Sequence, residues 1–247
     1  ASGTPRPANT MEEYGVIGPA YYRACASGIL HPVPDNAQKQ ARYQLGEAIG
    51  HGGQGHTFRA TDVETGKTVA VKRLRLKGAD SWKPFDLFER ECAVLATLDH
   101  AGIPDYLDNF ADEEAGEFFL VMELVEGETL RDKVRKGAPL EEAQLWNVLH
   151  QALEILGYLH GLNRPVIHRD VKQNTLVLRP DNRFYLVDFG GVRVAMREDG
   201  GSTMVGTFGF MAPEQLHGEA TPATDIYGLG ATLATLIMGN PDLDFMY

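Results

Sequence analysis

The sequence has few cysteines, no long apolar run and no long basic run, and each absence excludes a class of protein. Its two cysteines, Cys25 and Cys92, are too few and too unpatterned for a disulfide framework or a zinc site. No stretch approaches the roughly 18 consecutive apolar residues of a membrane-spanning helix, and the N-terminus lacks the basic and apolar segments of a secretory signal. We therefore expect a soluble, cytoplasmic protein without a membrane partner.

Positive charge is also scarce. The formal net charge is −11, and the longest basic run, residues 72–77, directly follows an apolar strand pattern. Phosphate contacts with nucleic acid need clustered Lys and Arg side chains, so we interpret this run as a solvated strand end. The sequence therefore predicts no nucleic-acid partner.

The apolar residues, 43% of the chain, are enough for a sizeable core. Residues 1–40 mix Pro, Gly, Ala and Ser and are expected to form an N-terminal extension or linker. Residues 41–125 predict five antiparallel strands. The first begins at Tyr43 and leads into the glycine-rich turn of residues 50–55, and the others span residues 56–61, 68–72, 106–110 and 118–123, with an amphipathic helix over residues 85–98. We expect this segment to form the first of two domains.

Residues 126–247 have a mainly helical pattern. It predicts helices over residues 129–136, 139–160 and 225–238, with short strands near Val166, Leu176 and Tyr185. A strand-rich domain followed by a helical one indicates an α+β fold of two lobes with a cleft between them.

A glycine-rich motif, Gly50-x-Gly52-x-x-Gly55, is compatible with nucleotide binding but weak alone. A dinucleotide-binding turn should lead directly into a helix, whereas Gly55 is followed by a strand and a turn. The pattern therefore indicates a hairpin, whose tip glycines let backbone N–H groups close over phosphates without a side chain in the way. This context disfavours a nucleotide-dependent oxidoreductase.

Lys72 ends an apolar strand, and Glu91 follows on the predicted helix, on a face shared with Leu95 and Leu98. A carboxylate at that position would hold the Lys72 ammonium toward phosphate oxygens. The alternative is an ordinary exposed strand lysine.

Taken in order, the glycine loop, residues 69–72 (VAVK), 168–170 (HRD), 188–190 (DFG) and 211–214 (MAPE) resemble the eukaryotic-type serine/threonine protein kinases, which include the bacterial Hanks-type enzymes. The resemblance covers residues 43–240. It implies that Lys72 pairs with Glu91 to hold the α/β-phosphates and that Asp170 orients the substrate hydroxyl. It further implies that Lys172 lies beside the transferred phosphate and that Asp188 binds Mg²⁺.

The resemblance also implies an ATP site, with Met122 as the gatekeeper and the backbone of Glu123 and Val125 facing adenine. Thr57 stands where the family prefers Val. The residues expected to bind ATP are Ile49, Gly50, Gly52, Gly53, Gly55, Thr57, Ala70, Lys72, Met122, Glu123, Val125 and Val177.

Two neighbouring residues are candidates for the second Mg²⁺ ligand. The family carries an Asn five residues after the catalytic Asp, and here that position is Thr175, with Asn174 one residue earlier. A gapless alignment makes Thr175 the ligand, whereas an alignment with one residue missing after Lys172 makes it Asn174. We prefer Asn174 because the second alignment preserves the amide oxygen; a hydroxyl can still ligate Mg²⁺.

Two further residues have alternative roles. Asp225 begins the last predicted helix and is expected either to cap its N-terminus or, by resemblance, to brace the loop of residues 168–170. Arg169 suggests regulation by a phosphate on the activation loop, with Ser202 and Thr203 as better candidates than Thr207, which matches the substrate-pocket threonine.

The sequence thus predicts ATP- and Mg²⁺-dependent phosphoryl transfer to Ser and Thr hydroxyls of protein substrates, with possible autophosphorylation of the activation loop. The alternative is a pseudokinase acting as a nucleotide-binding or scaffold module, which Thr175 and the short helical half suggest. The family continues past residues 225–238 with more helices, so an uncovered apolar face there would predict association.

Overall fold

The computed structural model describes residues 36–52, 55–76, 83–112, 115–137, 140–194, 206–207 and 209–240. Four sequence predictions lie outside these residues: the extension over residues 1–35, the nucleotide contact of Gly53, and the phosphorylation sites Ser202 and Thr203. The chain divides into two compact units. The first runs to Ala96 and includes Tyr106–Leu124, and the second contains Thr97–Asp105 and the chain from Val125.

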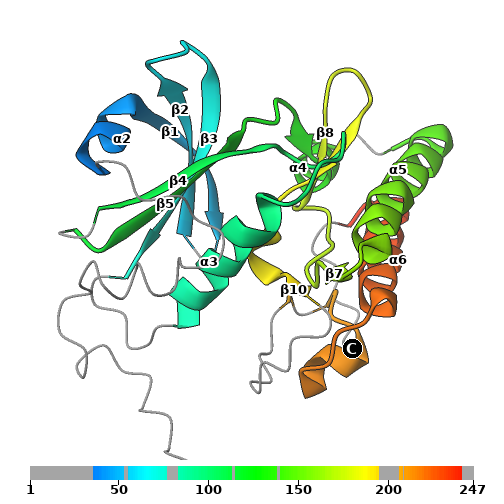
Figure 1. Ribbon diagram of the computed structural model, residues 1–247. Helices are drawn as coiled ribbons and strands as arrows, with labels where there is room; N and C mark the ends of the chain where they lie inside the picture. Colours follow the sequence, from blue (N-terminus) through cyan, green and yellow to red (C-terminus); the bar gives the residue numbers. More distant parts are fainter. Residues whose placement is uncertain are drawn as a thin grey trace, which may run out of the picture. The chain divides into compact units, whose positions relative to one another are not determined.

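The first unit is built on a five-stranded antiparallel sheet in the order β1-β2-β3-β5-β4 (Figure 1). Its strands are β1 (Tyr43–Gly52), β2 (Gly55–Asp62), β3 (Thr68–Arg75), β4 (Tyr106–Asp112) and β5 (Glu117–Glu123), and its helix α3 spans Lys83–Leu95. Val71 and Val121 are register partners on β3 and β5 and are fully buried. The predicted five strands and one helix are confirmed.

A short helix, α2 (Asn36–Arg42), precedes β1. Lys39 Nζ lies 2.6 Å from Asp108 Oδ1 on β4, and Arg42 donates to both carboxylate oxygens of Asp62 at 2.8 Å. The last residues of the predicted extension are therefore helical and joined to the sheet.

The second unit contains the helices α4 (Leu130–Arg135), α5 (Glu142–Gly161) and α6 (Pro222–Ile237), with α5 and α6 packed side by side (Figure 1). A three-stranded sheet has the order β6 (Glu128–Thr129), β8 (Leu176–Leu178), β9 (Phe184–Leu186), and β7 (Val166–Ile167) pairs with β10 (Arg193–Val194). Two 3-10 helices, η2 (Phe189–Gly191) and η3 (Pro213–His217), follow β9 and precede α6. Among the residues that the structure describes, every helix is too short or too polar to cross a bilayer.

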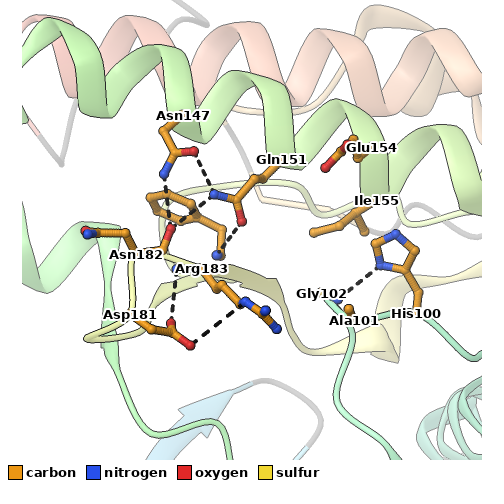
Figure 2. A pocket seen from close by; sticks show the side chains of 11 residues that line it. His100, Ala101, Gly102, Asn147, Gln151, Glu154, Ile155, Asp181, Asn182 and Arg183 are labelled. Atoms are coloured by element: carbon orange, nitrogen blue, oxygen red, sulfur yellow. Dashed lines mark hydrogen bonds and ion pairs between the residues drawn. The ribbon is translucent and has the colours of Figure 1, made fainter.

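The turn between β8 and β9 is fixed to α5 beside a pocket (Figure 2). The Gln151 amide accepts a hydrogen bond from the Phe184 backbone N–H at 3.0 Å and donates to the Asn182 carbonyl at 3.1 Å. Gly102 approaches α5 so closely that an added Cβ would lie 2.6 Å from Ile155 Cδ1. None of the pocket residues belongs to the predicted ATP or metal site. These contacts instead hold in place the strand that leads to Asp188.

Candidate functional site

Lys72 on β3 and Glu91 on α3 form a buried ion pair in the first unit. The Lys72 ammonium lies 2.8 and 2.7 Å from the two oxygens of Glu91. The side chains are only 7% and 2% exposed. A charge pair taken so far out of water needs both partners, because either ion alone would be uncompensated. The structure thus brings together the two residues that the sequence predicts to act as a pair.

The glycine motif lies at the tip of the β1–β2 hairpin, as the sequence predicts. Gly55 has φ 134°, and an added Cβ would lie 2.3 Å from the Arg73 carbonyl oxygen. Only glycine fits this position without a backbone shift. Gly50 is different, because its added Cβ would make an ordinary 3.6 Å contact with Thr57.

The first unit also holds most residues of the predicted adenine site. Ala70 and Met122 are register partners on β3 and β5, and both are buried. Thr57 is the register partner of Lys72, and Glu123 ends β5. Ile49 is 44% exposed on β1. The remaining two predicted contacts belong to the second unit, where Val177 is buried in β8 and Val125 is half-buried.

In the second unit, Asp170 lies in a cluster with Lys172 and Thr207. Lys172 Nζ is 2.7 Å from Asp170 Oδ2, and the Thr207 hydroxyl donates to Asp170 Oδ1 at 2.8 Å. Lys172 also donates to the Thr207 hydroxyl. The carboxylate therefore has an ammonium on one oxygen and a hydroxyl on the other.

Asp225 braces the loop that carries Asp170. Its Oδ2 accepts the backbone N–H of His168 at 2.9 Å, and its Oδ1 accepts the N–H of Arg169 at 2.7 Å. Helix α6 begins at Pro222 after Thr221, so Asp225 lies inside the helix. Of the two predicted roles, the structure shows the brace and not the helix cap, because the N-cap residue is Thr221 and the Asp225 carboxylate is directed at a loop more than 50 residues earlier in the chain.

Arg169 has positive φ, 67°, and is 6% exposed. Its guanidinium donates to the backbone carbonyls of Gly191 and Val192. These bonds join the Asp170 loop to the segment that follows Asp188. The structure thus shows Arg169 bonded to backbone groups, whereas the sequence suggests a phosphate partner.

Asp188 follows β9 at φ 66° and is exposed, whereas the next residue, Phe189, is 1% exposed. The Phe189 ring meets the His168 ring edge to face at 5.0 Å. Burial lowers the pKa of His168, and neither of its ring nitrogens has a hydrogen-bond partner among the described residues. His168 is therefore a neutral packing residue rather than a proton carrier.

The two candidate metal ligands after Asp170 lie in different environments. The Thr175 side chain is 2% exposed, and its hydroxyl donates to the Asp170 carbonyl at 2.9 Å. The same oxygen accepts the Lys172 N–H at 3.1 Å. Asn174 is exposed in the same turn. Asn174 was preferred from the sequence, whereas the side chain that contacts the Asp170 backbone is that of Thr175.

Two residues that hold the Asp170 loop were not predicted from the sequence. The Gln215 amide donates to the Arg169 carbonyl at 2.9 Å, and His160 Nε2 lies 2.8 Å from Asp225 Oδ2. Gln215 directly follows the motif at residues 211–214, which was the only signal for it. Nothing in the local pattern around His160 points to this contact.

Comparison with known proteins identifies the class. The family described as "Protein kinase domain" matches residues 43–244. The chain is 36% identical over 214 residues, 80% of its length, to serine/threonine-protein kinase D of Synechocystis sp.. It is 34% identical over 208 residues, 81% of its length, to serine/threonine-protein kinase PknB of Mycobacterium tuberculosis. The chain belongs to the protein kinase family, as the ordered motifs predict.

The chain spans 41% of the length of the Synechocystis relative and 33% of the length of PknB. The matched region includes the ion pair of the first unit and the Asp170 cluster of the second. Both relatives are named serine/threonine-protein kinases.

Proposed function

We propose that the chain is the catalytic domain of a protein that transfers the γ-phosphate of ATP to Ser and Thr hydroxyls of protein substrates. The cluster of Asp170, Lys172 and Thr207 carries this proposal. A threonine hydroxyl already donates to Asp170 Oδ1 at 2.8 Å, so this carboxylate oxygen is accessible to an aliphatic hydroxyl. A substrate hydroxyl that took the same place would be oriented for attack.

The chain's own groups supply the electrostatics of the transfer. Phosphoryl transfer needs mainly positioning and neutralisation of charge on the phosphate oxygens. Asp170 accepts the hydrogen bond of the substrate hydroxyl and takes its proton. Lys172, held 2.7 Å from Asp170, presents an ammonium to the transferred phosphate. Asp225 fixes the backbone that places both side chains.

We assign the binding of the nucleotide phosphates to residues of the first unit. Glu91 holds the Lys72 ammonium in one orientation, and we assign Lys72 to the α/β-phosphates. Gly50, Gly52, Gly53 and Gly55 leave the backbone N–H groups of the hairpin accessible to phosphate oxygens. We assign the adenine to the backbone of Glu123 and Val125, with apolar contacts from Ile49, Ala70, Met122 and Val177, and with Thr57 beside them.

We assign Mg²⁺ to Asp188 and Thr175. Mg²⁺ in such sites takes one or two carboxylates and completes its shell with water and substrate phosphates. The exposed Asp188 carboxylate fits this requirement, and the Thr175 hydroxyl keeps one lone pair after its two hydrogen bonds. When bound, Mg²⁺ neutralises charge on the phosphates.

The helical unit is the proposed surface for association with a protein. Helix α6 and its C-cap residue expose large apolar side chains, namely Ile226, Tyr227, Ile237 and Met238. Exposed apolar patches of this kind commonly bind another protein surface. Sedimentation of the wild type and of Ile237→Lys, over a range of concentrations, tests this assignment. We also propose a cytoplasmic location, which the free, buried thiol of Cys92 supports.

The kinase proposal is tested with labelled ATP, a generic protein substrate and the chain itself as acceptor. We expect transfer in the wild type and a loss of about 10²–10⁴-fold in kcat for Asp170→Asn, because the base is removed. The matched control is Asp181→Asn, an exposed acid in the β8–β9 turn, which should keep full activity.

Two outcomes would contradict the proposal. One is a folded wild type that transfers no phosphate with either Mg²⁺ or Mn²⁺. The other is undiminished transfer by Asp170→Asn. A thermal shift with ATP in a protein that transfers nothing would instead support a nucleotide-binding pseudokinase.

A further inference from the structure

Two histidines face each other near the tip of the β1–β2 hairpin, and the proposed kinase function uses neither. His51 on β1 and His56 on β2 are register partners. Their ring centroids are 4.9 Å apart, with the ring planes at 86°. Both side chains are exposed. Within the described part of the chain, neither imidazole takes part in a hydrogen bond or an ion pair.

The histidine pair lies on the face of the hairpin opposite to the proposed nucleotide contacts. Successive side chains of a strand point to opposite faces, so His51 and His56 point away from the side of Gly50 and Thr57. Phe58 shares the face of His56, with ring centroids 6.4 Å apart. The guanidinium of Arg73 lies over the Phe58 ring at 4.7 Å. The pair is therefore separate from the ATP site.

The spacing of the rings suits a shared metal ion. Zn²⁺ lies about 2.0–2.1 Å from a histidine nitrogen, which places it roughly 3.2 Å from the ring centroid. Two rings on one ion then have centroids about 4.5 Å apart at a ligand angle of 90° and about 5.2 Å apart at the tetrahedral angle. The observed 4.9 Å falls between these values.

We propose that His51 and His56 form a two-histidine site for a late first-row divalent metal ion, Ni²⁺, Cu²⁺ or Zn²⁺. Imidazole suits these ions, whereas Mg²⁺ prefers oxygen ligands, so Mg²⁺ does not compete for this site. Water completes the coordination shell. An ion held by both rings cross-links β1 and β2 beside the glycines and restricts the opening of the hairpin tip.

The alternative is an edge-to-face ring pair that stabilises the hairpin without binding an ion. Calorimetric titration of the untagged chain with Zn²⁺, in the presence of Mg²⁺ and without nucleotide, separates the two. We expect one high-affinity equivalent in the wild type and binding weakened by about tenfold or more in His51→Ala and in His56→Ala. The matched control, His150→Ala, removes an exposed histidine of α5 and should bind as the wild type does.

Cu²⁺ provides a second readout through its electron paramagnetic resonance spectrum. We expect the spectrum to show coupling of Cu²⁺ to two nitrogens in the wild type and to one nitrogen in His51→Gln or His56→Gln. Thermal melts show whether each variant is folded. The proposal is overturned if the wild type binds no Zn²⁺, if both single variants keep its affinity, or if His150→Ala loses as much. Because no readout uses phosphate transfer, failure here is distinguishable from failure of the kinase proposal.

Discussion

The Thr175 hydroxyl donates a hydrogen bond to the backbone carbonyl of Asp170 at 2.9 Å. A side chain five residues away thus fixes the backbone at the acid that we assign to the substrate hydroxyl. The same oxygen accepts the Lys172 N–H, so a single threonine organises the whole turn. Any substitution at residue 175 should therefore affect both this turn and the Mg²⁺ site that we assign to Asp188 and Thr175.

We expect Thr175→Val to lower kcat by about tenfold or more, because the part-buried Asp170 carbonyl and Lys172 N–H lose their hydrogen bonds to the hydroxyl. Asn174→Ala is the matched control and should change activity little, since Asn174 is exposed. Thr175→Asn restores an amide oxygen and should lower the Mg²⁺ concentration needed for half-maximal activity. Kinetics at varied Mg²⁺ test all three. A large loss in Asn174→Ala with none in Thr175→Val would favour the other alignment.

The buried pair of Lys72 and Glu91 should show strong coupling in stability. Glu91→Leu removes the carboxylate that lies 2.8 and 2.7 Å from the buried Lys72 ammonium and should cost about 3–5 kcal/mol in the free energy of unfolding. Adding Lys72→Met removes that ion and should recover part of the loss, although the double variant is inactive. Urea unfolding of the single and double variants measures the coupling.

Arg75→Met is the control for this cycle, because its side chain is 61% exposed in its pair with Glu117. It should cost less than about 1 kcal/mol. Strictly additive losses in the double variant would contradict the coupling of Lys72 and Glu91.

The substitution Asp225→Ser distinguishes two roles of Asp225, capping helix α6 and bracing the loop of residues 168–170. Serine is among the best capping residues, so a capping role would lose little stability and no activity. If Asp225 braces the loop, the variant loses two charge-assisted hydrogen bonds to the backbone of His168 and Arg169. We then expect the free energy of unfolding to fall by about 2–4 kcal/mol and kcat to be reduced. Chemical unfolding and phosphate-transfer rates measure the two effects. An active variant of wild-type stability would exclude the brace.

Glu89 on α3 should make stability depend on pH. Burial, with a smaller contribution from Asp86, raises the pKa of Glu89 to about 7. The folded state then keeps the proton while the unfolded state releases it near pH 4.3. The unfolded state binds fewer protons between about pH 4 and pH 7, so this group lowers stability as the pH rises through that window, and the penalty is complete above the folded pKa.

Glu89→Gln removes this penalty. At pH 8 it should be more stable than the wild type by on the order of 1 kcal/mol, after allowance for solvent screening, with a smaller gain at pH 5. Denaturant unfolding at both values tests it, with the exposed Glu154→Gln as the control. An equal gain at pH 5 and pH 8 would exclude titration as the cause.

The sheet of the first unit could be predicted because its signals are local, whereas the Lys72–Glu91 pair was expected from the resemblance of the ordered motifs. Strand alternation, the glycine turn and the spacing along α3 are each readable within about ten residues. Helix α2 was not predicted, since its partner Asp108 lies 69 residues further along the chain. A seven-residue helix is marginal without such contacts.

The sequence left the role of Asp225 and the register at Thr175 open for different reasons. The local pattern around Asp225 contains only the start of a helix, whereas its partners lie 56 and 57 residues earlier. At Thr175, two alignments differ by one residue, and composition cannot separate them. The position of the hydroxyl inside the turn distinguishes them, because Thr175 N–H also bonds to the Lys172 carbonyl and closes the turn.

Helix α2 has a consequence for association. β1 and β4 are the outer strands of the sheet, and such strands can pair with a foreign strand and start aggregation. Lys39 donates to the Asn109 carbonyl and to the Asp108 carboxylate, which places an ammonium against a backbone acceptor of β4. A lysine at that edge repels an incoming strand. We therefore expect the seven residues ahead of β1 to help keep this sheet from aggregating.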